Sequence, residues 1–115
     1  MNLDTITEIA IDHSGRLTIK PRNRKFEYIY RSATEVHWDS TNECLYSPKH
    51  REWSYLDWYK HMISSVESEY GCKLVLVEDT RWTNIPDTLK HEIEAWEKGN
   101  IEGSGRNQKQ GRERN

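Results

Sequence analysis

The segment from Ser54 to Gly71 constrains the fold more than any other part of the chain. Ser54 is a good helix N-cap residue, and Asp57 follows it three positions later, as in a capping box. Gly71 suits the left-handed position that ends a helix. Between them, apolar residues recur at steps of three and four; they are Tyr55, Tyr59, Met62, Val66 and Tyr70, with Trp58 and Ile63 beside them. The pattern predicts an amphipathic helix over residues 54–70 that packs against an apolar surface.

Candidate strands for that surface lie in the first half of the chain. Ile9 and Ile11 come before a polar turn at 12–15, and Leu17 and Ile19 follow it at alternate positions. This arrangement predicts a β-hairpin.

The next segments also have the composition of strands. Residues 26–31, FEYIYR, place Phe26, Tyr28 and Tyr30 at alternate positions, which predicts a third strand. Residues 35–39 and 43–47 then flank a polar turn, which predicts a second hairpin.

The second half adds one strand and one helix. Residues 73–79 contain four consecutive apolar residues, a pattern typical of a strand in the interior of a sheet. A helix is predicted from Pro86 to Gly99; its apolar face consists of Ile85, Leu89, Ile93 and Trp96.

This order of elements predicts an α+β fold with a mostly antiparallel sheet of five or six strands. One long helix packs on one face of the sheet, and a second helix is C-terminal. We expect one domain over residues 1–99. Residues 100–115 are polar and basic, and we expect them to form a disordered tail.

Charge and composition exclude several classes of function. The net charge is −2 overall, and it is −4 over residues 1–98. Nucleic acid is therefore an unlikely partner, because it needs a basic surface. The sequence has no secretory signal and no apolar stretch long enough to span a membrane, so we expect a cytoplasmic protein. Cys44 and Cys72 lack the spacing of a zinc site, and we expect no metal or cofactor.

The first candidate site consists of Glu35, His37 and Asp39, which alternate along one predicted strand. Side chains at alternate positions point to the same face, where two carboxylates and an imidazole suit metal binding or acid–base catalysis. The alternative is that they form the solvent-exposed face, opposite the core-facing Val36 and Trp38.

The second candidate site is aromatic and consists of four tryptophans, Trp38, Trp53, Trp58 and Trp82. Exposed indole rings would suit a cationic or flat apolar ligand, or a protein partner. The alternative is that these rings complete the core. No catalytic motif is present, so the sequence gives no support for an enzyme.

Several runs of the sequence resemble a known group of proteins. The runs are FEYIYR, EVHWD, LYSPK, REWSYLDWY and TRWTNIP, within residues 5–96. They resemble those of small bacterial proteins encoded on the gene cassettes of integrons, which are mobile genetic elements. The resemblance implies an α+β fold and a homo-oligomer, and it supplies no functional residues.

Two functions follow as expectations. The first is a non-enzymatic binding protein, such as an immunity-like or partner-binding module, whose partner is another protein or a second copy of the chain. The alternative is a small-molecule-binding protein or enzyme with an aromatic pocket.

Overall fold

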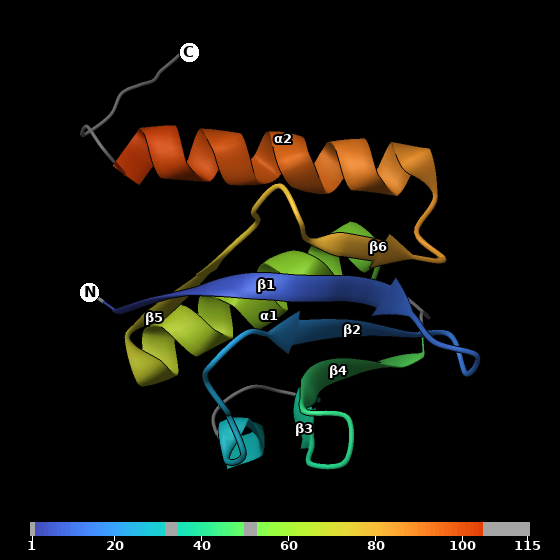
Figure 1. Cartoon of the computed structure of the whole chain (residues 1–115), viewed down its shortest axis with the longest axis vertical. Helices are drawn as coiled ribbons and strands as arrows, with labels where there is room; N and C mark the ends of the chain where they lie inside the picture. Colours follow the sequence, from blue (N-terminus) through green and yellow to red (C-terminus); the bar gives the residue numbers. More distant parts are fainter. Residues whose placement is uncertain (1, 32–34, 50–52, 105–115) are drawn as a thin grey trace.

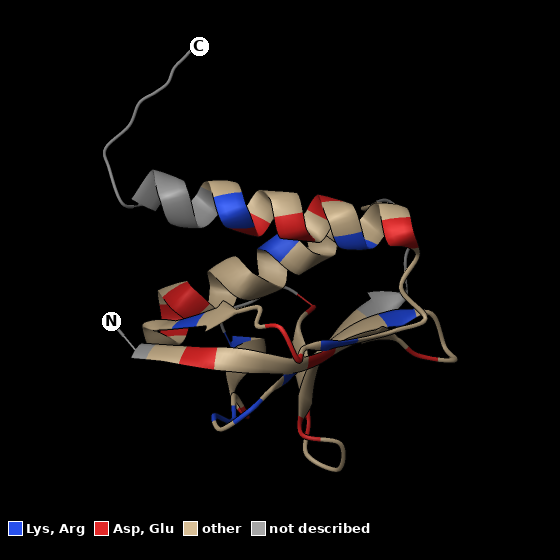
Figure 2. Cartoon of the chain, turned by 45° about the horizontal axis from the view of Figure 1, so that its top comes forward, with Lys and Arg blue, Asp and Glu red and all other residues tan. Residues whose placement is uncertain are grey.

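The structure is a computed structural model that describes residues 2–31, 35–49 and 53–104 (Figure 1). The strands are β1 (Asn2–Ile11), β2 (Arg16–Pro21), β3 (His37–Asp39), β4 (Cys44–Lys49), β5 (Cys72–Val75) and β6 (Arg81–Thr83). The helices are the short 3-10 helix η1 (Ile29–Arg31), α1 (Tyr55–Tyr70) and α2 (Asp87–Ser104). Both long helices lie on one side of the sheet (Figure 2). The predicted α+β class is therefore confirmed.

The sheet is mixed, because two strands run parallel to β1. The strand order is β3-β4-β2-β1-β5, and β6 also pairs with β1. The β1–β2, β2–β4 and β3–β4 pairs are antiparallel, which confirms both predicted hairpins. β5 pairs in parallel with residues 2–5 of β1, and β6 with residues 8–10.

β5 lies at an end of the strand order, so the prediction of an interior strand is wrong. The apolar run after Gly71 is divided between two kinds of contact. Cys72 and Leu74 are buried in the core, whereas Leu76 lies beyond the strand and its backbone N–H donates to Glu97 of α2 at 2.7 Å. An interior strand would have another strand beside it, but here α2 contacts the residues that follow β5.

Thr80 connects the two strands that share the edge of β1. The register of the β1–β2 pair shifts between Ile6 and Glu8. This shift separates the stretch of β1 that pairs with β5 from the stretch that pairs with β6. The buried Thr80 hydroxyl donates to the Ile6 carbonyl at 2.6 Å and accepts from the Val77 N–H at 3.0 Å. The side chain thus bonds the backbone of β1 at Ile6 and the backbone of the segment after β5 at Val77.

The prediction of a strand at 26–31 is wrong, because this segment forms a turn and η1. The Ile29 N–H donates to the Phe26 carbonyl at 3.1 Å, which closes a tight turn. Phe26 and Ile29 are fully buried, whereas Tyr28 and Tyr30 are each 55% exposed. The buried positions are therefore three residues apart, as in a 3-10 turn, and not two apart as in a strand.

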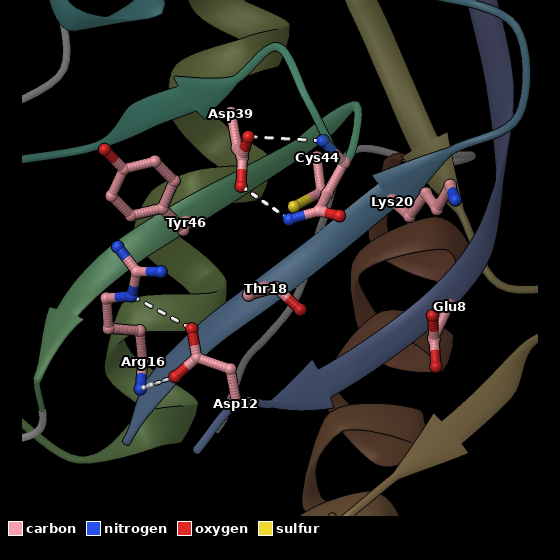
Figure 3. Close-up of a pocket in the computed structure, with 9 residues that line it drawn as sticks. Glu8, Asp12, Arg16, Thr18, Lys20, Asp39, Cys44 and Tyr46 are labelled. Atoms are coloured by element: carbon pink, nitrogen blue, oxygen red, sulfur yellow. Dashed lines mark hydrogen bonds and ion pairs between the residues drawn. The ribbon is translucent and has the colours of Figure 1, made fainter. Parts of the chain in front are cut away.

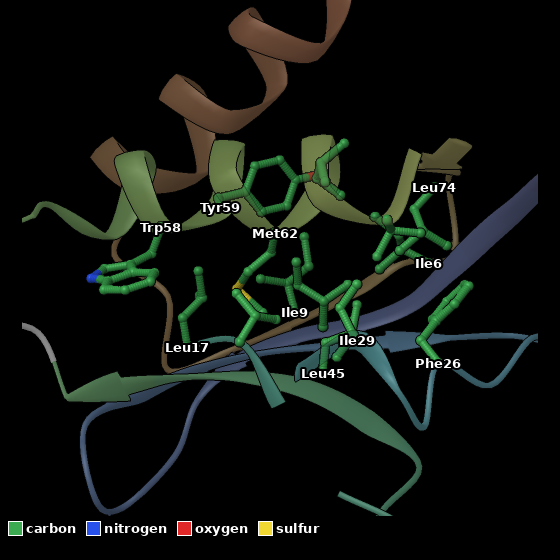
Figure 4. Packing of buried hydrophobic residues seen from close by; sticks show 14 of the residues in the cluster. Ile6, Ile9, Leu17, Phe26, Ile29, Leu45, Trp58, Tyr59, Met62 and Leu74 are labelled. Atoms are coloured by element: carbon green, nitrogen blue, oxygen red, sulfur yellow. The ribbon is translucent and has the colours of Figure 1, made fainter. Parts of the chain in front are cut away.

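The core lies between α1 and the sheet (Figure 4). The Asp57 N–H donates to the Ser54 hydroxyl at 3.1 Å, and Gly71 ends α1 with φ 64°, so both predicted caps are confirmed. The predicted apolar face is confirmed as well; its buried members are Trp58, Tyr59, Met62, Ile63 and Val66. α1 therefore packs its apolar face against one face of the sheet.

α2 packs on α1 and continues past the predicted end at Gly99. Leu89 and Ile93 are buried, and the ring of Trp96 meets Tyr59 edge-on at 5.8 Å. The helix extends through Gly99 and Gly103 to Ser104, since each glycine inside a helix costs only about 1 kcal/mol. Residues 100–104, which were expected in the tail, are therefore part of α2, and the rest of the predicted tail, residues 105–115, lies outside the described residues.

The contact between α2 and the segment after β5 predicts a pH effect on stability. Burial raises the pKa of Glu97, with Glu94 adding to it, despite the Leu76 N–H bond and nearby Lys73. A carboxyl whose pKa is higher in the folded chain favours the folded state less as pH rises through that pKa. Glu97→Gln keeps an acceptor for Leu76 but cannot ionise.

We expect the stability of Glu97→Gln, relative to the wild type, to increase between pH 4 and pH 7. Urea unfolding at several pH values measures the difference. Glu92→Gln, on the exposed side of α2, serves as the control, because Glu92 is not among the groups that shift the pKa of Glu97. A constant difference between Glu97→Gln and the wild type over this range would contradict the account.

Candidate functional site

The face of the sheet opposite the helices is uncovered within the described part of the chain, and it contains a hollow of about 200 Å³ (Figure 3). Nine residues of β1, β2, β3, β4 and the hairpin turns line this hollow: Glu8, Asp12, Arg16, Thr18, Lys20, Asp39, Asn42, Cys44 and Tyr46. We call this set the sheet-face hollow.

β2 runs through the middle of the hollow and sets its chemistry. Its residues alternate between the two faces of the sheet, as in any strand. Leu17 and Ile19 are fully buried toward the helices. Arg16, Thr18 and Lys20 therefore point to the hollow, as Figure 3 shows.

Arg16 is held in place by a carboxylate and an aromatic ring. Its Nε donates to Asp12 Oδ2 at 2.9 Å, and its backbone N–H donates to Asp12 Oδ1 at 2.9 Å. Its guanidinium lies 4.4 Å from the centre of the Tyr46 ring, a cation–π contact. No residue in the described ranges accepts a hydrogen bond from its Nη atoms, so these donors are available to a ligand.

The two carboxylates nearest to Arg16 and Tyr46 are held by hydrogen bonds that stabilise their charged form. Burial opposes ionisation of Asp12, but bonds from Arg16 and Ser14 outweigh it and lower its pKa. The Asn42 side chain is the main cause of the lowered pKa of Asp39, and the backbone N–H groups of Asn42 and Thr41 add to it. Both groups are therefore fixed anions and weak bases.

Cys44 is the thiol of the hollow, and it is protonated at neutral pH. Its side chain is 7% exposed, and burial raises its pKa to about 11, with Asp39 adding to the effect. A thiol reacts as a nucleophile only in its thiolate form. Cys44 is thus a packing residue with no sign of nucleophilic activation.

We expect Cys44 to react with an alkylating reagent about 100-fold more slowly in the folded chain than in the unfolded chain at pH 8, from the difference in thiolate fraction. A Cys72→Ala variant leaves Cys44 as the single thiol for this measurement. The rate should still be rising at pH 10. A plateau below pH 9 would show that the thiol is activated.

The structure places two of the three residues of the first candidate site, His37 and Asp39, at alternate positions of β3, and leaves Glu35 outside that strand. β3 begins at His37, and Glu35 lies before it in a left-handed conformation with φ 60°, so the expectation that all three share one strand is wrong. The His37 ring stacks on Tyr46 at 5.4 Å, and Asp39 accepts hydrogen bonds within its own turn. The core-facing role of Val36, opposite this face, is confirmed.

The four tryptophans of the second candidate site lie in three places. Trp53 and Trp58 are in contact at 4.7 Å, and His61 lies beside both. Trp38 meets Phe26 edge-on at 6.0 Å. Trp82, on β6, lies under the amino group of Lys90, with 5.5 Å between that nitrogen and the ring centre.

Most of these rings pack on the core. Trp58 is 8% exposed, Trp38 and Trp82 are half-buried against the core, and Trp53 is 44% exposed. The described residues therefore form no pocket shared by the four tryptophans.

Sequence reasoning missed Arg16, Lys20 and Tyr46 as site residues. A signal was present, because Arg16, Thr18 and Lys20 alternate with the core residues of β2. Nothing in the sequence pairs β2 with Tyr46, which is 30 residues beyond Arg16 and reaches it through the β2–β4 pairing.

The described ranges contain neither a metal-binding cluster nor a membrane-spanning helix. No group of three or more His, Cys, Asp or Glu side chains there is placed to hold a metal ion. No described helix is both long enough and apolar enough to cross a membrane.

Comparison with known proteins gives two matches. A family model described as "Integron Cassette Protein Hfx_Cass5" matches residues 4–80, which include the sheet-face hollow and end before β6. A solved structure from the mobile metagenome of the North West Arm sewage outfall, also described as integron cassette protein Hfx_Cass5, is 41% identical in sequence. The match covers 83% of this chain and 95% of that chain, with a TM-score of 0.44. A search of curated proteins found no match.

Proposed function

The chain belongs to the Hfx_Cass5 family of integron cassette proteins, and from this premise we propose that it is a non-enzymatic binding protein whose partner docks on the sheet-face hollow. The observation that carries the proposal is the arrangement around Arg16. Asp12 and Tyr46 hold its guanidinium in place, while its terminal nitrogens have no acceptor in the described ranges. A cationic group fixed in this way loses little conformational freedom when a partner binds.

The protonation states of the hollow support binding over catalysis. Cys44 is a thiol with a pKa of about 11, and the pKa values of Asp12 and Asp39 are lowered. A general acid or base works best with a pKa near the operating pH. The pKa values of these three groups are shifted away from neutral pH. The two carboxylates therefore stay charged and the thiol stays protonated.

The size of the hollow supports a protein partner. Its volume of about 200 Å³ is below the roughly 300–1,000 Å³ of typical small-molecule pockets. It has room for one or two side chains of a partner protein, and the uncovered sheet around it supplies further contact area. The partner is another protein or a second copy of this chain.

A photocrosslinker placed in the hollow tests the proposal. Tyr46 is replaced by the aromatic crosslinker p-benzoylphenylalanine, and a matched protein carries it at Glu94, on the exposed side of α2. Both are irradiated in a lysate of the host bacterium. We expect a discrete adduct from position 46 only, and we expect an excess of unlabelled wild-type protein to suppress it.

The outcomes are distinct. A saturable adduct with a second copy of the chain identifies self-association, which sedimentation of the purified protein then confirms. Equal adducts at both positions, or adducts that the wild-type protein does not suppress, would contradict the proposal. If a metabolite raises the melting temperature and no adduct forms, the hollow is a small-molecule site.

A further inference from the structure

A second surface, at the end of the sheet next to η1, differs in charge from the rest of the protein. Residues 22–31 contain four of the 17 Lys and Arg residues and one of the 19 Asp and Glu residues. This segment therefore has a net charge of +3, whereas the other 105 residues together have −5, from the total of −2. We define the basic tyrosine surface as Arg24, Lys25, Tyr28, Tyr30 and Arg31.

The surface combines exposed rings with arginines. Tyr28 and Tyr30 are each 55% exposed, and they are two of the four large apolar side chains exposed in the described ranges. The Arg31 guanidinium lies 4.7 Å from the centre of the Tyr28 ring. Neither Arg31 nor Arg24 forms an ion pair with a carboxylate in the described ranges. The N–H groups of both guanidinium groups can therefore donate to a partner. Tyrosine and arginine are enriched at the energetic centres of protein interfaces.

The backbone beneath the surface is fixed. Phe26 and Ile29 are fully buried and anchor the segment to the core. The Tyr28 N–H donates to the hydroxyl of Tyr70 at 3.2 Å, and the Arg24 N–H donates to Asp4 at 2.8 Å. A surface that is ordered before binding gives a tighter complex, because less entropy is lost.

We propose that the basic tyrosine surface binds an acidic segment of a partner protein. An arginine side chain presents parallel N–H donors that match a carboxylate, and the tyrosine rings cover the apolar stems around it. This surface lies outside the sheet-face hollow and uses different residues. The inference therefore stands independently of the proposed function.

Charge distribution favours an acidic polypeptide over a nucleic acid. Nucleic-acid binding depends on neutralising a long row of phosphates. Here Lys25 is paired with Glu43 at 3.2 Å, and Glu27 lies between the cations. The net charge of −5 on the rest of the chain repels a polyanion that extends beyond the surface. A short segment with a few carboxylates meets the cations without that repulsion.

Fluorescence anisotropy with defined probes tests the inference. The probe is a labelled peptide of Glu-Glu-Leu repeats; a peptide of Gln-Gln-Leu repeats and a thymidine oligonucleotide of the same length serve for comparison. We expect the full chain to bind the glutamate peptide at least tenfold more tightly than either at low salt, with weaker binding as salt rises. Equal affinity for the glutamine peptide, or tighter binding of the oligonucleotide, would overturn the inference.

Matched variants locate the site. Arg24→Ala/Arg31→Ala and Tyr28→Ala/Tyr30→Ala are each expected to weaken binding of the glutamate peptide about tenfold. Lys60→Ala/Lys98→Ala also removes two positive charges, but from the helices, and it should change the affinity for the glutamate peptide less than twofold. An equal loss in this control would show that net charge, and not this surface, binds the peptide. The comparison of peptides on the wild-type protein remains decisive if a variant fails to fold.

Discussion

Phe26→Ala is expected to lower the free energy of unfolding by about 3–5 kcal/mol, the usual cost of deleting a buried phenylalanine side chain. Phe26 is fully buried, and its ring meets Tyr70 at 4.9 Å and Trp38 at 6.0 Å, both edge-on. It therefore joins the end of α1 to β3 through the segment that precedes η1. The loss should appear as a lower midpoint in urea unfolding, followed by circular dichroism.

Tyr28→Ala is the matched control for this prediction. Tyr28 is 55% exposed, so its truncation should cost less than about 1 kcal/mol. In the strand that the alternating pattern indicated, Phe26 and Tyr28 would share one face and have similar effects. Similar losses in the two variants would therefore contradict the turn and support a strand.

Asp4→Ala is expected to cost about 2–4 kcal/mol, because it leaves several partly buried backbone donors without their acceptor. Asp4 is 3% exposed. Its carboxylate accepts from the backbone N–H groups of Asn23 at 3.0 Å and Arg24 at 2.8 Å, and from its neighbour Thr5 at 2.9 Å. These bonds hold the loop that follows β2 against the start of β1.

Two further variants separate the hydrogen bonds from charge alone. Asp4→Asn keeps the shape of the side chain but turns one acceptor into a donor that faces backbone N–H groups, so it should also destabilise the chain. Asp79→Ala removes a carboxylate that is 73% exposed and paired with Arg22, and should cost at most about 1 kcal/mol. If Asp79→Ala costs as much as Asp4→Ala, the buried network does not have the role that we assign to it.

The parts of the fold that could be predicted are those fixed by local chemistry. α1 follows from Ser54, Gly71 and an apolar stripe between them, all within one segment. The hairpins follow from alternating residues on either side of a short polar turn. In these cases the residues that decide the structure are neighbours in the sequence.

The parts that could not be predicted depend on contacts between distant segments. Phe26, Tyr28 and Tyr30 alternate as they would in a strand, yet the core accepts Phe26 and Ile29, which are three positions apart. β5 and β6 pair with β1, about 70 residues away, and only those pairings show that the sheet is mixed.

The same distinction applies to the site. Glu35, His37 and Asp39 alternate in the sequence and so predicted a site on one strand, but β3 begins only at His37. The sheet-face hollow instead joins Arg16 of β2 to Tyr46 of β4, a contact that only the β2–β4 pairing creates. The four tryptophans of the second candidate site mostly pack on the core, and none of them lines the sheet-face hollow.

The affinity for the crosslinked partner, measured with purified proteins by calorimetry, tests the role of the sheet-face hollow most directly. Lys20 lines the hollow, and Lys20→Glu reverses a charge there. The new carboxylate lies opposite Glu8 of β1, so urea unfolding first checks that the variant is folded. We expect this variant to bind at least tenfold more weakly than the wild type. Trp53→Ala, in the exposed aromatic cluster near the start of α1, should bind within twofold of it. Unchanged affinity for Lys20→Glu together with a large loss for Trp53→Ala would place the binding surface on the tryptophans and contradict the account.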